Sequence, residues 1–133
     1  MTHFKHTFIT FEGIEGSGKS TQSKKLHEFL LSQNMNTILT REPGGTKASE
    51  QIRNILISDD LDKLEAKTEL LLNFAARLEH VEKLIKPALA NKKIVISDRF
   101  FDSTFANLVI SSIYFLGNPN VFPIHFATAI DVE

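Results

Sequence analysis

The chain contains the run Gly13-Ile14-Glu15-Gly16-Ser17-Gly18-Lys19-Ser20, which fits the pattern G-x-x-x-x-G-K-[ST] of a phosphate-binding loop. Glycines let such a loop turn its backbone N–H groups inward, at dihedral angles that side chains would forbid. In this pattern Lys19 reaches the β- and γ-phosphates of a nucleotide, and the Ser20 hydroxyl binds Mg²⁺. An ordinary glycine turn before a helix is the alternative interpretation, so the neighbouring sequence matters.

The loop lies between a predicted strand and a predicted helix. Residues 8–11 predict the strand, and residues 19–32 predict the helix because Leu26, Phe29 and Leu30 recur at helical spacing. The N-terminus of that helix would add its positive dipole end to an anion site. Strand, glycine loop and helix in this order are the setting that the motif requires.

Strands and helices alternate along the rest of the chain. Strands are predicted at 36–40, 94–96 and 126–132, and helices at 47–57, 65–80, 81–90 (with a break or restart at Pro87) and 103–115. The apolar run at 94–96 is typical of a strand buried on both faces of a parallel sheet. The pattern predicts an α/β fold of the P-loop NTPase type, with three α/β/α layers and a mostly parallel sheet. We expect one domain over residues 1–133.

Three polar segments follow three of the predicted strands. Residues 13–20 follow the first strand, residues 41–46 follow the second, and Asp98-Arg99 follows the strand at 94–96. Ligands of open α/β sheets bind outside the carboxyl ends of the strands. We therefore expect these three segments to converge on one edge of the sheet.

The charged residues of these segments suggest two phosphate sites. Asp98 would hold a magnesium ion beside the phosphate loop, or alternatively cap the following helix. Arg41 and Arg99 would clamp a phosphate other than the one in the loop, which suggests two phosphorylated substrates. The alternative for each arginine is a surface ion pair with Glu42 or Asp102.

Two further segments carry candidate ligand contacts. Arg77 interrupts an apolar stretch beside two alanines, which leave room for a flat ligand. Phe74 would stack on a base there, or alternatively pack in the core. Glu15, inside the loop, would accept a hydrogen bond from a sugar hydroxyl.

Composition excludes several classes of protein. The 133 residues are 42% hydrophobic and 23% charged, with a formal net charge of -1, which argues against a general nucleic-acid binder. The absence of cysteine excludes disulfides and zinc–thiolate sites and agrees with a cytoplasmic protein. No apolar stretch approaches the roughly 20 residues of a membrane span. The five histidines have no metal-ligand spacing, so we interpret them as surface or core residues.

Four segments resemble motifs of the thymidylate kinase family. Residues 11–22 resemble its phosphate loop, and Arg41-Glu42-Pro43-Gly44-Gly45-Thr46 resembles its much more specific Arg-Glu-Pro-Gly-Gly-Thr motif. Phe74-Ala75-Ala76-Arg77 and Asp98-Arg99-Phe100 are similar to its acceptor-binding helix and its Asp-Arg-Tyr motif. The resemblance runs in order from about Phe8 to Phe105.

The resemblance implies phosphoryl transfer from ATP to dTMP with Mg²⁺, giving dTDP, in a homodimer. The catalytic residues it implies are Lys19, Asp98 and Arg99, with Ser20 and Asp98 at the metal. The residues it implies for ATP are Gly13, Ile14, Glu15, Gly16, Ser17, Gly18, Lys19, Ser20 and Thr21. The residues it implies for dTMP are Glu15, Arg41, Phe74, Arg77, Arg99, Ser103 and Thr104. Alternatives are another P-loop nucleotide or nucleoside kinase, and a nucleotide-binding remnant with little activity.

The chain departs from the family pattern at three places. Asn73 stands where the family has an aromatic ring, and Ala106-Asn107-Leu108 stands where it has Ala-Tyr-Gln. The resemblance implies a single P-loop nucleotide kinase domain over residues 1–133. Because family members are longer, it also implies a C-terminally short copy, with a sheet that is incomplete at its C-terminal end and without the arginine-rich lid. Because Gly16 and Ser17 leave no arginine in the loop, the resemblance puts the catalytic cation in that lid, and we expect poor turnover.

Overall fold

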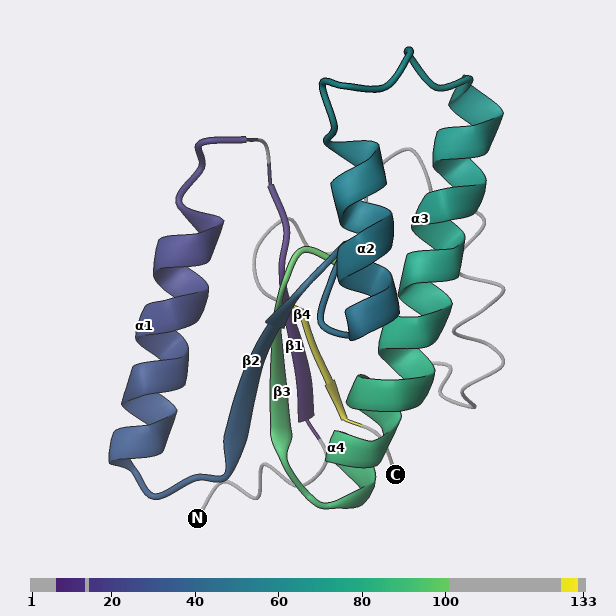
Figure 1. The fold of residues 1–133 in the computed structure, drawn as a ribbon. Coiled ribbons are helices and arrows are strands. Elements are labelled where there is room, and N and C mark those ends of the chain that lie inside the picture. Colours follow the sequence, from purple (N-terminus) through teal and green to yellow (C-terminus); the bar gives the residue numbers. More distant parts are fainter. Residues whose placement is uncertain (1–6, 14, 101–127, 132–133) are drawn as a thin grey trace.

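The computed structural model describes residues 7–13, 15–100 and 128–131 (Figure 1). Its elements, in chain order, are β1 (Thr7–Phe11), α1 (Lys19–Ser32), β2 (Thr37–Arg41), α2 (Lys47–Leu56), α3 (Ala66–His80), the π-helical turn η1 (Val81–Ile85), α4 (Lys86–Ala90), β3 (Ile94–Asp98) and β4 (Thr128–Asp131). Ile14, the helix predicted at 103–115, and Ser103 and Thr104 lie outside the described residues.

The strands form one sheet in the order β2-β3-β1-β4. β3 pairs in parallel with β1 and with β2, which confirms the predicted α/β fold. The strand predicted at 126–132 is observed at 128–131, and it runs antiparallel to β1. The register places Phe11 and Arg41 on either side of Asp98. The three predicted polar segments therefore leave the sheet at one edge.

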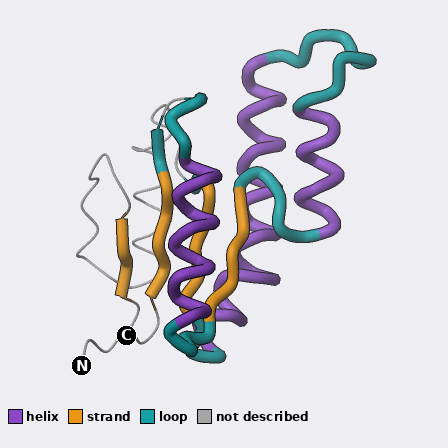
Figure 2. Tube along the Cα trace, turned by 90° about the vertical axis from the view of Figure 1, so that its left-hand side faces the viewer, coloured by secondary structure: helices purple, strands orange, loops and turns teal. Residues whose placement is uncertain are grey.

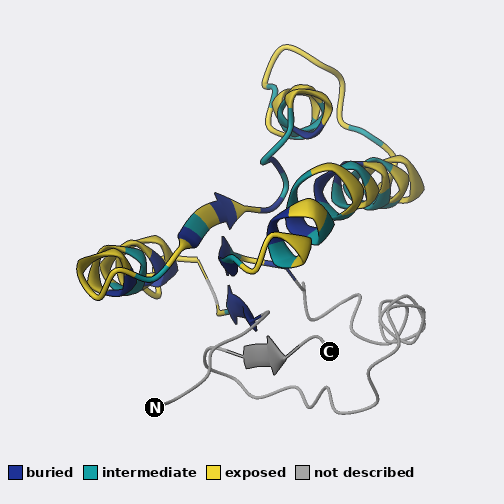
Figure 3. Cartoon of the chain, turned by 90° about the horizontal axis from the view of Figure 1, so that it is seen from below, coloured by how far each residue is buried: buried dark blue, intermediate teal, exposed yellow. Residues whose placement is uncertain are grey.

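Helices cover both faces of the sheet, as the predicted three layers require. Viewed along the strands, α1 lies on one side and α3 to α4 lie on the other (Figure 3). One core cluster, under η1 and α4, consists of Phe8, Ile85, Ala88, Val95 and Phe100. The other, under α1, consists of Ile9, Leu30, Ile94 and Ile96. The run at 94–96 is buried on both faces, as its continuous apolar sequence predicts.

The helix pair α2–α3 extends beyond the carboxyl ends of the strands (Figures 1 and 2). The Thr46 side chain caps α2 by accepting a hydrogen bond of 3.1 Å from the Ser49 N–H. The chain stays helical from α3 through η1 into α4. Pro87 lies in the first turn of α4, where its missing N–H is tolerated. In place of the predicted break, the helix has the wide π turn η1 directly before α4.

Candidate nucleotide-binding site

The phosphate loop ends at the N-terminus of α1. Gly18, the N-cap residue, has φ +85° and no side chain caps the helix, so its first N–H groups point toward the loop. Lys19 is buried, and its Nζ donates to Ser17 Oγ at 3.3 Å. Glu15 is exposed in the loop. Backbone donors, a buried lysine and the helix dipole together form a site for an anion.

Ser20 and Asp98 meet at the base of this loop. The Ser20 hydroxyl donates to Asp98 Oδ2, and Asp98 Oδ1 is buried without a hydrogen-bond partner among the described residues. A hydroxyl beside a carboxylate with an unused oxygen is a donor set that suits Mg²⁺. The described part of the chain holds no cluster of three His, Cys, Asp or Glu side chains that could bind a metal ion.

Arg41 is held loosely at the end of β2. Its side chain is 52% exposed, and its Nη2 donates to Glu50 Oε2 at 3.0 Å, so the alternative partner Glu42 is wrong for this arginine. Glu50 Oε1 also accepts the Gly45 N–H at 3.0 Å. The Gly45 hydrogen bond, with the Arg41 guanidinium as a smaller contribution, holds the pKa of Glu50 below its usual range.

Arg77, by contrast, is held in a largely buried position on α3. Its Nε donates to Glu42 Oε2 at 2.7 Å, and the two side chains are only 17% and 5% exposed. The ring of Phe100 lies 5.2 Å from the centre of the guanidinium. Phe100 is fixed in turn, because its backbone N–H donates to Glu12 Oε1 at 2.8 Å.

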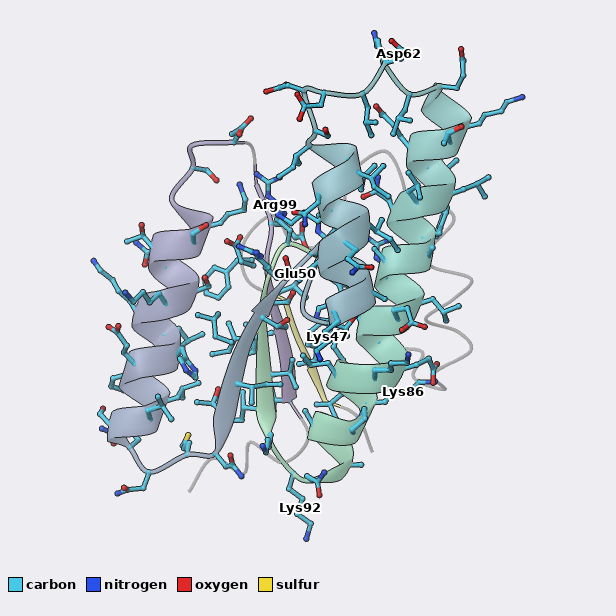
Figure 4. The ribbon with its side chains drawn as sticks, viewed as in Figure 1. Lys47, Glu50, Asp62, Lys86, Lys92 and Arg99 are labelled. Atoms are coloured by element: carbon cyan, nitrogen blue, oxygen red, sulfur yellow. The ribbon has the colours of Figure 1, made fainter. Side chains whose placement is uncertain are left out.

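Arg99 follows β3 at the same edge of the sheet. It adopts φ +68°, a left-handed conformation that is uncommon for a residue with a side chain. Its N–H donates to Phe11 O at 3.0 Å, which ties it to the end of β1. Figure 4 shows Arg99 near the carboxyl ends of the strands, on the same edge as Glu50.

The predicted base-stacking region of α3 is only partly buried. Phe74 is half-buried, between the two alternatives of a stacking ring and a core residue. Asn73, which stands at the family's aromatic position, donates its amide to Glu69 O at 2.9 Å. This side chain is therefore hydrogen-bonded to its own helix.

An open cavity of about 380 Å³ brings the segments together. Its lining includes Ser20 of α1 and Asp98 of β3, beside the phosphate loop. It also includes Arg41 of β2 and Glu50 of α2. Sequence reasoning missed Glu50 as the partner of Arg41 and Glu42 as the partner of Arg77. The available signal for Glu42 was its place inside the Arg-Glu-Pro-Gly-Gly-Thr run.

A glycine loop at a helix N-terminus, with Ser20 of that helix in one cavity with Arg41 before a second loop, defines a P-loop nucleotide-binding protein. Comparison with known proteins identifies the group within this class. The family model described as "Thymidylate kinase" matches residues 11–112. The chain belongs to the thymidylate kinase family.

Individual relatives agree with this assignment. Thymidylate kinase of Ruegeria pomeroyi is 53% identical over 97 residues, which cover 73% of this chain and 46% of that protein. Thymidylate kinase of Wolbachia pipientis is 54% identical over 101 residues, which cover 74% and 50%. The crystal structure of thymidylate kinase from Ehrlichia chaffeensis matches with a TM-score of 0.71 and 46% identity, over 87% of this chain and 70% of that one. The chain spans about half the length of the curated relatives it matches.

Among the described residues, no helix has the length and apolar character needed to cross a bilayer.

Proposed function

We propose that this chain transfers the γ-phosphoryl group of ATP to dTMP, giving dTDP and ADP. One observation carries the proposal: Ser20 and Asp98, beside the phosphate loop, share a cavity with Arg41 of the second loop. The proposal takes the Ser20–Asp98 side of that cavity as the donor side and the Arg41 side as the acceptor side, because transfer between two nucleotides requires both. The 53% identity to a thymidylate kinase supports dTMP as the acceptor.

On the donor side, the proposal assigns the ATP phosphates to residues 13–21. The loop N–H groups and Lys19 bind the β- and γ-phosphates, and Ser20 and Asp98 hold Mg²⁺. An ion held by Ser20 and Asp98 would supply positive charge against the phosphates. The buried position of Lys19 limits how far its charge can move from the phosphates.

On the acceptor side, the proposal assigns the dTMP phosphate to Arg41, Arg77 and Arg99. Guanidinium groups bind phosphate through paired N–H donors and fix its orientation. An acceptor phosphate oxygen then attacks the γ-phosphorus, and the bond from that phosphorus to the bridging oxygen breaks as ADP leaves. Glu15 would contact the deoxyribose, and Phe74 and the residues Ser103 and Thr104 would contact the base.

The proposal extends to assembly and location. A homodimer is proposed from the family alone, and a cytoplasmic location from the need for ATP and dTMP. Sedimentation of the purified chain would test the first.

The test of the function is ADP release by the 133-residue chain with ATP–Mg²⁺ and a panel of acceptors: dTMP, dUMP, dCMP, AMP and thymidine. We expect release with dTMP above the acceptor-free rate and none with thymidine, which offers the arginines no phosphate. Lys19→Ala, purified in parallel, is the matched control for contaminating kinases.

Two outcomes would contradict the proposal in different ways. Equal use of AMP or dCMP would favour another nucleotide kinase on this fold. Thermal shifts with dTMP and ATP–Mg²⁺, without any acceptor-dependent ADP release, would favour a binding protein without turnover.

A further inference from the structure

The backbone of Arg99 is unusual for its place in the fold. Among the described residues, three non-glycine residues have a positive φ: Asn34, Lys92 and Arg99. Asn34 and Lys92 follow the C-terminal ends of α1 and α4, where a left-handed residue commonly ends a helix. Arg99 follows a strand instead, with φ +68°. Backbone strain of this kind persists only where the surrounding contacts fix it, and it clusters at functional sites.

The peptide group before Arg99 is held by the backbone of the sheet. The Asp98 carbonyl accepts the Glu42 N–H at 3.1 Å. The Arg99 N–H donates to the Phe11 carbonyl at 3.0 Å. Both hydrogen bonds extend the pairing of β3 with its neighbours β1 and β2. The main chain of the sheet therefore orients this peptide.

The peptide group after Arg99 is held by two side chains. The buried Ser97 hydroxyl donates to the Arg99 carbonyl at 2.7 Å. The Phe100 N–H donates to Glu12 Oε1 at 2.8 Å. The φ and ψ angles of Arg99 are the rotations that relate its two flanking peptides. Hydrogen bonds to both peptides therefore fix these angles, and Ser97 and Glu12 supply the part that a side-chain substitution can remove.

The Phe100 ring anchors the far side of this turn. Phe100 is buried, and its ring meets the Phe8 ring edge-on, with the two ring centroids 4.9 Å apart. Arg99, directly before it, is exposed. Within the described residues the Arg99 guanidinium pairs with no carboxylate, so its direction depends on the backbone that carries it. A backbone that relaxed to an ordinary negative φ would send this side chain in another direction.

Glu12 ties the turn to the phosphate loop. It is the residue directly before Gly13, with which the loop begins. Its half-buried side chain reaches from the end of β1 to the backbone that follows β3. One side chain therefore joins the loop proposed for ATP to the arginine proposed for the acceptor phosphate.

We propose that Glu12 and Ser97 are positioning residues that hold Arg99 in its left-handed conformation for the phosphate of a nucleoside monophosphate. The inference rests on the proposed function, because it names the groups that orient one acceptor arginine. Glu12 and Ser97 act through the backbone of Arg99, and neither is assigned a contact with substrate.

The test is equilibrium binding of dTMP and thymidine to the 133-residue chain by titration calorimetry. The ratio of the thymidine Kd to the dTMP Kd isolates the phosphate contribution. We expect Glu12→Ala and Ser97→Ala each to raise the Kd of dTMP roughly five-fold, because one lost hydrogen bond lowers the population of the binding conformation by about that factor. The Kd of thymidine should change by less than about two-fold.

Two variants separate positioning from general damage. Glu12→Gln keeps a side-chain oxygen that accepts the Phe100 N–H, so its Kd for dTMP should stay within about two-fold of the wild-type value. Asn91→Ala is the matched control, because Asn91 Nδ2 donates to the Pro87 carbonyl at 2.8 Å, near the opposite end of β3. It removes a side chain-to-backbone hydrogen bond but should leave both Kd values unchanged. Ser97→Ala removes only a hydroxyl, so it decides the question if Glu12→Ala does not fold.

A double variant tests whether Glu12 acts through Arg99. In an Arg99→Ala background, Glu12→Ala should change the Kd of dTMP by less than about two-fold, because no guanidinium is left to orient. A further several-fold loss in that background would show that Glu12 affects dTMP by another route, and would refute the positioning role.

The remaining outcomes distinguish the inference from the function on which it rests. A wild-type chain that binds dTMP no better than thymidine, or an Arg99→Ala variant that keeps the full preference for dTMP, would refute the proposed acceptor site. A preference that depends on Arg99 but survives both Glu12→Ala and Ser97→Ala would refute only the positioning role. Equal loss of both ligands in these variants would also refute it, because that pattern indicates general structural damage.

Discussion

The substitution Gly45→Ala should destabilise the fold strongly, although it adds one methyl group. Gly45 has φ +89°, where a residue with a Cβ is strained by about 1–2 kcal/mol. The new Cβ would also lie 2.6 Å from His80 Cδ2 and 2.7 Å from Thr40 Oγ1. Overpacking of this kind costs about 1–3 kcal/mol. The two contributions together give a loss of about 2–5 kcal/mol.

The measurement is urea and thermal unfolding of the full chain without nucleotide. For a chain of 133 residues, the expected loss lowers Tm by roughly 6–20 °C. Gly18→Ala is the matched control, because Gly18 has φ +85° but a Cβ added there would meet no atom within 4 Å. Gly18→Ala should therefore show only the backbone strain of about 1–2 kcal/mol.

The difference between the two variants isolates the collision with His80 and Thr40. We expect Gly45→Ala to lose at least about 1 kcal/mol more than Gly18→Ala. Equal losses would show that the His80 ring moves away without penalty, and the description of a closely packed network would then be wrong.

Three further results are expected. Lys19→Ala should abolish ATP–Mg²⁺ binding while the circular dichroism spectrum is retained; unchanged ATP affinity would refute the assignment of the loop. Arg99→Ala should raise the Kd of dTMP roughly ten-fold and leave that of ATP nearly constant; comparable losses for both ligands would count against two separate phosphate sites. Because Gly45 N–H and Arg41 lower the pKa of Glu50, its contribution to stability is present above about pH 4.5 and is lost as the pH falls through the lowered value. Glu50→Gln should accordingly be less stable by up to about 1 kcal/mol at pH 7, with the gap closing in acid; a gap independent of pH would contradict this.

The sequence predicted the sheet and the convergence of its loops because these follow from short-range patterns. A phosphate loop needs a strand before it and a helix after it, and β3 begins with the continuous apolar run 94–96. The direction of β4 was not predictable in this way. Its residues 128–131 pair with β1, which lies near the other end of the chain, and no local pattern distinguishes a parallel from an antiparallel partner.

The partners of the arginines were harder to predict than the arginines themselves. For Arg41, the alternative to a phosphate clamp was an ion pair with its sequence neighbour Glu42, but adjacent residues of an extended segment point in opposite directions. Arg41 pairs instead with Glu50 on α2, and Glu42 turns inward to Arg77 on α3. His80, interpreted as a surface or core residue, is in the core. It lies three residues after Arg77 on the same helix face, and this spacing was the available signal that the two side chains share Glu42 as a partner.

The ion pairs Arg77–Glu42 and Arg41–Glu50 differ in burial. A binding site with one fixed and one adaptable side would require such a difference. Removing Glu42 would leave Arg77 as a buried cation without its partner, which is strongly unfavourable, so this pair fixes one geometry. Arg41 and Glu50 are 52% and 40% exposed, and water can replace either partner at little cost. Arg41 can therefore leave Glu50 for another anion at little cost, whereas Arg77 stays beside Glu42.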